Sequence, residues 1–564
     1  MRPLPLLALP LAALPVLLAA CSASDYREDA DRQVYGILGE AAEHVTGTPK
    51  TFDIDRPTDT LRTRLEQEPE LEVVLDLPAA LDVAAENSRD FQRQKELLYL
   101  AALDLTGEQH EFALRFSGGA GGDVSGVGDD TADASIRSDL FASRNTASGG
   151  RIVASFVNSF LKDLLTGGSF NGASVLGLTL TQPLLRGAGE RIAREPLTQA
   201  ERDVVYAMRT FERFRATFSV RVVAEYYGLL EQIQNLESEE KNVESTRLNR
   251  ERVEALVEAS RRPPVDLDRV RTDELSAQDR YNNAQASLNA ALDRIKLTLG
   301  LPTDARLQLD LDELENLRRL EIEPIEMTPA EAIDLALARR LDYRVRVDDV
   351  EDAGRRVMVA ENALESSLDF SAALSVPSEA GQPLDIDWSQ VGWSIGFDLD
   401  LALDRLPERN AYRSALINMA ATIRARELAE DQVKAEVRDA LRQLQRTYTS
   451  YQIQSAALEV AESREERARL LLEAGRSDTL ALVDATRALL AARLDLAGAI
   501  VDYAVARLEL LRDLEGLVLE PKGLRYDPGL PLPSHPLPDA TAKGEAGTPP
   551  EPIPSGNPPG EESL

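Results

Sequence analysis

One stretch constrains the fold more than any other, because residues 408 to 474 contain neither glycine nor proline. They are rich in Ala, Leu, Arg, Glu and Gln, which favour helices, and a continuous helix of that length would extend about 100 Å. No compact domain needs such a rod, so partner helices are expected beside it. A coiled-coil spacing of four and three residues runs through Val433, Val437, Ala440, Leu444, Thr447, Tyr451, Gln454, Leu458 and Ala461.

Composition narrows the classes of protein that fit this rod. The chain has 63 Lys plus Arg against 96 Asp plus Glu, a formal net charge of -33. Such a polyanion is a poor nucleic-acid binder, because binding requires cationic groups that replace the counterions of the phosphates. Hydrophobic residues make up 43% of the chain and aromatic residues only 5%. These values favour a helical protein with Ala and Leu contacts over an aromatic-rich β-sandwich.

The first residues resemble a bacterial lipobox. Arg2 precedes an apolar run from Leu4 to Leu18, and the run closes at Leu18-Ala19-Ala20-Cys21. The resemblance implies that residues 1–20 are a signal peptide and that Cys21 is the lipidated first residue of the mature chain. Ordinary signal-peptide cleavage is the alternative.

Cysteine and histidine usage excludes several kinds of site. Cys21 is the only cysteine, so no intramolecular disulfide forms, and the three histidines are widely scattered. The sequence lacks a phosphate-binding loop, a His-Glu-x-x-His motif and a Gly-x-Ser-x-Gly motif. We therefore expect neither an enzyme nor a cofactor. An Asp-rich piece from Asp123 to Asp133 has no EF-hand spacing and is interpreted as a solvated loop.

The order of segments predicts two similar halves. Residues 80–91 align without gaps with residues 332–343, and Gly300 corresponds to Gly516. Each half is predicted as helix, strand, loop, strand, very long helix, turn and shorter helix. The first half is longer between these landmarks, and we place the extra residues in its Gly-rich loop.

The predicted boundaries follow from these patterns. Residues 119–171 are predicted as a long loop, in which Ile152 to Leu165 could form an additional strand. The predicted segments are an accessory segment (21–77), a first repeat (78–300), a linker (301–327), a second repeat (328–519) and a Pro-rich disordered tail (520–564). The first repeat has strands at about 110–118 and 175–182 and helices at 197–262 and 265–300. The second repeat has strands at about 368–376 and 391–401 and helices at 408–474 and 478–515.

The strands of the second half alternate clearly. Trp393, Ile395 and Phe397 share one face, whereas Ser394, Asp398 and Asp400 share the other. Such alternation suits a sheet with lipid outside and water inside. A soluble antiparallel sheet with one buried face predicts the same pattern.

The polar positions of interest lie at the turns after the two long helices, within residues 258–268 and 473–485. Their ordinary role is to end one helix and cap the next, as Gly475 and Ser477 or Asp478 are suited to do. In a closed assembly, identical Asp side chains of these turns would form a ring that attracts or repels ions in a pore.

The duplicated strand and helix order, the piece Gln182-Pro183-Leu184-Leu185-Arg186-Gly187 and the turn from Glu473 to Ala485 resemble the TolC-type outer-membrane efflux factors, over about residues 78–519. The lipobox is similar to that of lipid-anchored members. The resemblance implies a mainly α fold with a small membrane β-barrel. Three chains with four strands each would form a twelve-stranded barrel above a helical periplasmic tunnel.

The resemblance also implies site residues and partners. Asp484, Asp266 and Asp268 would narrow the pore, and a tip of Ser260, Arg261, Gly475, Arg476 and Ser477 would meet a periplasmic adaptor protein beside an inner-membrane pump of the resistance-nodulation-division class. The basic partner that the family places opposite Asp266 is Ser477 here, with Arg476 next to it. The expected function is an outer-membrane exit duct. A channel for type I protein secretion and a coiled-coil lipoprotein without a pore are the alternatives.

Overall fold

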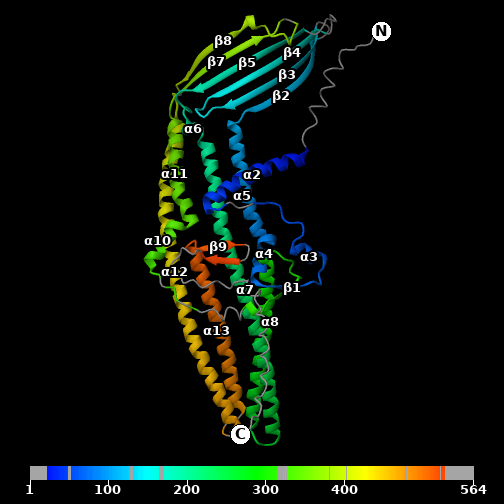
Figure 1. Ribbon diagram of the computed structural model, residues 1–564, viewed down its shortest axis with the longest axis vertical. Helices are drawn as coiled ribbons and strands as arrows, with labels where there is room; N and C mark the ends of the chain where they lie inside the picture. The colour runs from blue at the N-terminus through cyan, green and yellow to red at the C-terminus, as the bar shows by residue number, and fades with distance from the viewer. Residues whose placement is uncertain are drawn as a thin grey trace, which may run out of the picture.

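The computed structural model describes residues 22–48, 52–127, 131–163, 171–313, 322, 324–325, 327–379, 381–401, 403–474, 476, 479–520 and 523–526. The predicted signal peptide, Cys21 and the tail from residue 527 onward lie outside the described residues. Figure 1 shows a curved sheet at one end of an elongated molecule and long helices that run to the opposite end. The prediction of a mainly helical fold with a small sheet is confirmed.

The helices differ greatly in length. The longest are α7 (Glu195–Glu258, 64 residues) and α12 (Leu406–Glu473, 68 residues), each about 100 Å long at 1.5 Å per residue. Each turns back into a shorter helix, α8 (Pro264–Leu299) or α13 (Thr479–Asp513). The others are α2 (Ala23–Thr46), α3 (Leu61–Gln67), α4 (Leu77–Asn87), α5 (Arg89–Phe112), α6 (Glu190–Ala193), α10 (Pro329–Arg339) and α11 (Leu341–Asn362).

Local sequence explains where these helices begin and end. Asp76 caps α4 by accepting a hydrogen bond from Ala79 N at 2.9 Å. Thr328 and Glu331 form a capping box before α10, and these hydrogen bonds lower the pKa of Glu331. Gly300 ends α8 in the left-handed conformation. At the end of α13 that position is held by Glu515, with φ 50°, so the counterpart of Gly300 is Glu515 and not Gly516 as expected.

Six antiparallel strands form the large sheet, in the order β2-β3-β4-β5-β7-β8. The first four follow one another in the chain, and the last two come from the second half. Their bounds are β2 (Arg115–Val127), β3 (Thr131–Asn145), β4 (Arg151–Asp163), β5 (Asn171–Pro183), β7 (Ser367–Pro377) and β8 (Gly392–Asp400). Two short sheets complete the fold, a parallel pair of β1 (Glu72–Leu75) with β6 (Arg306–Leu309) and a hairpin of β9 (Leu517–Glu520) with β10 (Gly523–Tyr526).

The prediction of four strands per chain is wrong, because β3 and β4 add a hairpin to the sheet. The additional strand considered at Ile152 to Leu165 is present as β4, whereas β3 was not predicted. The first predicted strand, 110–118, is also misplaced, since α5 continues to Phe112 and β2 extends to Val127. The physical reason is that backbone pairing needs no apolar side chain. Gly-, Ser- and Asp-rich strands therefore pair along their length, as β2 and β3 do from Arg115↔Ser143 to Val127↔Thr131.

The turn between β3 and β4 is held against the chain segment that links β5 to α7. The amide of Gln182 donates to Ser148 O at 3.0 Å, and Ser148 Oγ donates to Gln182 Oε1 at 2.9 Å. Gly189 N also donates to Ser148 O, at 3.1 Å. Gly149 has φ 89°, and a side chain there would collide with the carbonyl oxygen of Gly187. The β3–β4 hairpin is therefore a packed part of the sheet.

Three apolar cores lie along the helices. One joins α4, the middle of α7 and the end of α8, a second joins α10, α12 and α13, and the third joins α2, α5 and the first part of α7. The third core includes Val34 and Leu38, which are fully buried. The expectation that residues 21–77 form an accessory segment outside the core is therefore wrong, because α2 covers apolar side chains of α5 and α7.

A buried ionic cluster joins α7 to α11, which belong to different halves of the chain. The side chain of Asp352 is 2% exposed, and its carboxylate lies 2.7 Å from Arg202 Nε and 3.0 Å from Arg355 Nη1. Tyr206 donates its hydroxyl to the same carboxylate at 2.9 Å. Arg355 also pairs with Glu195 at 3.0 Å. The two halves are thus tied by charge as well as by apolar contact.

None of the helices in the described ranges combines the length and the apolar character needed to cross a membrane.

Candidate functional site

The two faces of the six-stranded sheet have opposite chemical character. The pairing register places most of the large apolar side chains of the six strands on the same side of the sheet. The side chains of this apolar face include Phe116, Ile136, Leu140, Ile152, Phe156, Phe160, Leu176, Leu178, Leu180, Phe370, Leu374, Trp393, Ile395, Phe397 and Leu399. Several are strongly exposed, with Phe116 at 77% and Trp393 at 73%. An exposed apolar surface of this extent needs an apolar environment.

The opposite face carries the charges. Its Arg and Asp side chains are spread over five of the strands and include Arg115, Asp123, Arg137, Asp139, Arg151, Asp369, Asp398 and Asp400. A row of three polar side chains, Ser138, Asn158 and Ser174, crosses the apolar face. They form hydrogen bonds with one another, since Asn158 donates to Ser138 Oγ at 3.2 Å and accepts from Ser174 Oγ. The separation has further exceptions, since Arg144 and Lys162 lie on the apolar face and Phe141, Val153, Val157, Leu161 and Val175 lie on the charged face. Over most of the sheet, apolar and polar surfaces are separated as in a wall between lipid and water.

The outer strands of this sheet, β2 and β8, each have one unpaired edge. The free N–H and C=O groups of such an edge pair readily with another strand. Six strands are also too few to close on themselves, because even eight strands leave an interior filled by side chains. The six strands of a single chain therefore do not enclose a pore.

The helix turns that contain the predicted tip residues lie at the end of the molecule opposite the sheet (Figure 1). At the first turn Ser260 takes the left-handed conformation, with φ 54°, and Arg261 N donates to Leu256 O at 2.8 Å. A serine thus occupies the position at which glycine is usual. Ion pairs hold the two helices together above the turn, since Arg250 contacts Glu274 at 2.6 Å and Arg271 contacts Glu254 at 3.0 Å.

The second turn is described only in part. Gly475 and Ser477 lie outside the described residues, whereas Arg476 is exposed and donates its N–H to Leu471 O at 2.9 Å. Asp484 is exposed on the second turn of α13, and Asp268 is exposed near the start of α8. Asp484 and Asp268 are therefore open to solvent within the single chain, as ring-forming carboxylates must be.

Asp266 has a partner within its own turn. Its carboxylate lies 3.5 Å from Arg262 Nη1, with both side chains partly exposed. An ion pair so exposed is weak. A basic residue from the second turn would compete with Arg262 for the carboxylate of Asp266. The sequence analysis did not consider Arg262 as a partner of Asp266.

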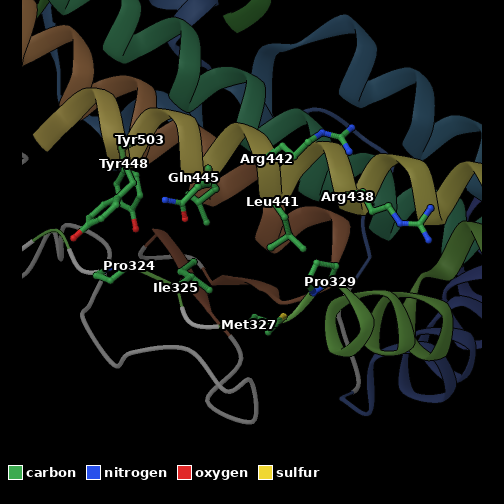
Figure 2. A pocket seen from close by; sticks show the side chains of 11 residues that line it. Pro324, Ile325, Met327, Pro329, Arg438, Leu441, Arg442, Gln445, Tyr448 and Tyr503 are labelled. Carbon is green, nitrogen blue, oxygen red and sulfur yellow. The ribbon is translucent and has the colours of Figure 1, made fainter. Parts of the chain in front are cut away.

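A concave groove lies elsewhere, midway along the helices. Its volume is about 440 Å³, and none of the predicted site residues lines it. Tyr448 of α12 and Tyr503 of α13 lie together at one end, with ring centroids 5.9 Å apart (Figure 2). Arg438 and Arg442 lie further along α12. Sequence reasoning missed this groove, because Pro324, Ile325, Met327 and Pro329 reach α12 only through the tertiary fold. Among the described residues, no cluster of three or more His, Cys, Asp or Glu side chains could hold a metal ion.

The fold has clear counterparts among solved structures, although no family model and no curated protein matches the sequence. The chain shares the fold of bacterial outer-membrane channels. The Campylobacter jejuni CmeC outer membrane channel has a TM-score of 0.57 at 15% identity, over 78% of this chain and 85% of that one. The Vibrio cholerae outer membrane protein VceC gives 0.55 at 15% identity, over 78% and 95%.

The open-state Neisseria gonorrhoeae MtrE outer membrane channel gives a TM-score of 0.53 at 15% identity, over 78% of this chain and 88% of that one. These alignments span most of each counterpart's length. At such low identity they establish the arrangement of helices and sheet, and the function has to be argued from the surfaces described above.

Proposed function

We propose that this chain is the outer-membrane exit duct of a tripartite efflux system, a passive channel for small solutes. The observation that carries the proposal is the six-stranded sheet with an exposed apolar face and a charged face. Its strands have 9 to 15 residues, and about 9–11 tilted residues span a bilayer. A coiled-coil scaffold without a pore would have no use for such a sheet.

The proposal includes an assembly and two partners. Three copies would close the sheets into a barrel in the outer membrane, with the helices below as a periplasmic tunnel. The turns at Ser260 to Arg261 and at Gly475 to Ser477 would contact a periplasmic adaptor, which connects the duct to an inner-membrane pump of the resistance-nodulation-division class. The likeness to outer-membrane channels supports this assembly, and no catalytic step is assigned to the chain.

Single-channel recording tests the pore. Purified protein reconstituted in a planar bilayer is expected to give discrete conductance steps with a preference for cations, because carboxylates line the proposed tip. A preparation that is folded by circular dichroism but carries no current at any voltage would reject the duct. Recovery of an exported polypeptide inside the channel would favour type I secretion instead.

The acidic ring is tested with Asp484→Ala. In a trimer this change removes three carboxylates at one level, so we expect a higher conductance and about tenfold weaker block by a trivalent cation, equivalent to about 1.4 kcal/mol. Asp495→Ala is the matched control, because Asp495 is exposed on the same helix and lies about three turns further from the tip. Equal effects of the two changes would remove Asp484 from the constriction.

Lipidation is tested with Cys21→Ala. The lipobox predicts that processing of the wild-type precursor is blocked by globomycin, an inhibitor of lipoprotein signal peptidase, and that the variant accumulates uncleaved. Globomycin-sensitive cleavage that persists without Cys21 would contradict the prediction. Labelling with radioactive palmitate provides the second readout, since only the wild-type chain should incorporate it.

A further inference from the structure

The β3–β4 hairpin adds two strands to the sheet at a defined place. The four helices that join the sheet pack in the order α5, α7, α11, α12. The strands that continue them follow the same order, with β2 after α5, β5 before α7, β7 after α11 and β8 before α12. The β3–β4 hairpin lies between β2 and β5. Two of the six strands are therefore not continued by a helix.

The width of the sheet matches the width of the helix layer. Adjacent strands are about 4.8 Å apart, and at a tilt of about 40° six of them cover about 37 Å of circumference. Four strands would cover only about 25 Å by the same reasoning. Four helices at 8–10 Å spacing cover about 36 Å. Six strands thus continue the helix layer at nearly constant width.

The β3–β4 hairpin also has the surface of a wall. On its apolar side Ile136, Leu140 and Phe156 continue the apolar face of the neighbouring strands. On its other side Arg137 and Asp139 continue the charged face, together with the apolar Phe141, Val153 and Val157. Its turn is fixed by Gln182 and by the close approach of Gly149 to Gly187. These contacts hold the hairpin in the plane of the sheet, where it cannot act as a plug.

We infer that three copies of this chain close through pairing of β2 of one copy with β8 of the next, which gives an eighteen-stranded barrel about 1.5 times as wide as a twelve-stranded one. This inference rests on the proposed trimeric duct. Each unpaired edge then meets the complementary edge of a second copy, and both faces continue across the junction. The lumen at the membrane would be wide enough for an aqueous channel, as in barrels of 16–18 strands.

Strand pairing between copies is tested by disulfide scanning. Phe116→Cys on β2 is combined in turn with Ile395→Cys, Phe397→Cys and Leu399→Cys on β8, all on the apolar face. Within one chain β2 and β8 are separated by four strands, about 24 Å, so no intramolecular disulfide can form. We expect one combination to give covalent trimers on a denaturing gel. The pair Phe116→Cys with Leu178→Cys is the control that should stay monomeric.

Strand number is measured by electron cryo-microscopy of the purified wild-type assembly in nanodiscs, viewed end-on. Eighteen strands support the inference, and twelve strands with the β3–β4 hairpin displaced from the wall overturn it. A variant lacking residues 128–168 retains β2 and β5 in antiparallel orientation, and its barrel should be narrower by about one third. If this variant fails to fold, the wild-type strand count still decides.

The two proposals fail in different ways. An eighteen-stranded trimer without conductance would contradict the exit duct and leave the barrel intact. A conducting trimer with twelve strands would contradict the barrel and leave the duct intact. Absence of covalent trimers in all three cysteine combinations, together with a monomeric wild-type chain, would reject β2–β8 pairing.

Discussion

Ile395→Arg is expected to abolish most of the folded, membrane-inserted protein, whereas Ser394→Arg is expected to be tolerated. The two residues are neighbours near the middle of β8, opposite Ala372 and Ala373 respectively, and so lie on opposite faces of the sheet. An arginine on a lipid-facing strand position near the middle of a bilayer costs about 2–4 kcal/mol, whereas an arginine facing a lumen does not carry this cost.

The measurement is the amount of heat-modifiable, protease-resistant protein in outer-membrane fractions for each variant. Ser394→Arg should keep the wild-type amount and shift ion preference toward anions in planar bilayers. Comparable losses for the two variants would mean that both faces are buried in the same way. The sheet would then be a soluble one, and the exit duct would lose its main support.

Asp352→Ala should be the most destabilising single change in the helical part of the molecule. It removes the buried carboxylate that forms ion pairs with Arg202 and Arg355 and accepts a hydrogen bond from Tyr206. Loss of one partner from a buried ionic cluster costs about 3–5 kcal/mol. We expect the lower end of this range, because Arg355 keeps its ion pair with Glu195 and Arg202 keeps its contact with Glu351. Since the cluster joins α7 to α11, the midpoint of denaturation in detergent should fall for both halves together.

Asp349→Ala is the control for that experiment. Asp349 lies on the same helix and forms a more exposed ion pair with Arg346 at 3.2 Å, so its removal should cost less than about 1 kcal/mol. A loss for Asp352→Ala no greater than that of the control would contradict the structural role of the cluster.

The same cluster gives stability a dependence on alkaline pH. Burial and the hydrogen bond to Asp352 raise the pKa of Tyr206 above its usual value of 10.0. A raised pKa means that the folded state favours the neutral phenol, so the contribution of Tyr206 is present below pH 10 and is lost as the pH rises further.

The sequence predicted the helical part of this molecule more closely than the sheet. Long segments rich in helix-favouring residues and free of Gly and Pro clearly predict a helix. The helix α12 begins and ends within two residues of the predicted 408–474. The strands of the second half were also recognisable, because Trp393, Ile395 and Phe397 alternate with polar residues. In β2 and β3 most positions of the apolar face hold Gly, Ala or Ser, with Phe116, Val124, Ile136, Leu140 and Arg144 as exceptions. The periodicity was therefore too weak to distinguish strand from loop.

In the proposed assembly the candidate site is formed by more than one chain, and this limits what the sequence of one chain reveals. Asp484 and Asp268 are exposed in the single chain, and their place at a pore stays a prediction, because a ring requires copies related by symmetry. The pairing of Asp266 with Arg262 depends on the geometry of a single turn. The hydrogen bonds of Gln182 to Ser148 could not be predicted either, because Ser148 lies in the β3–β4 turn and Gln182 at the end of β5.

The β3–β4 hairpin has a consequence for how channels of this shape evolve. It begins where β2 ends and finishes where β5 begins, both at the end of the sheet away from the helices, so its gain or loss leaves the direction of every other strand unchanged. A gene could therefore acquire or lose about forty codons here and change the bore by two strands per subunit without altering the helix that follows Gly189. Bore and tunnel length would then be inherited as separate traits.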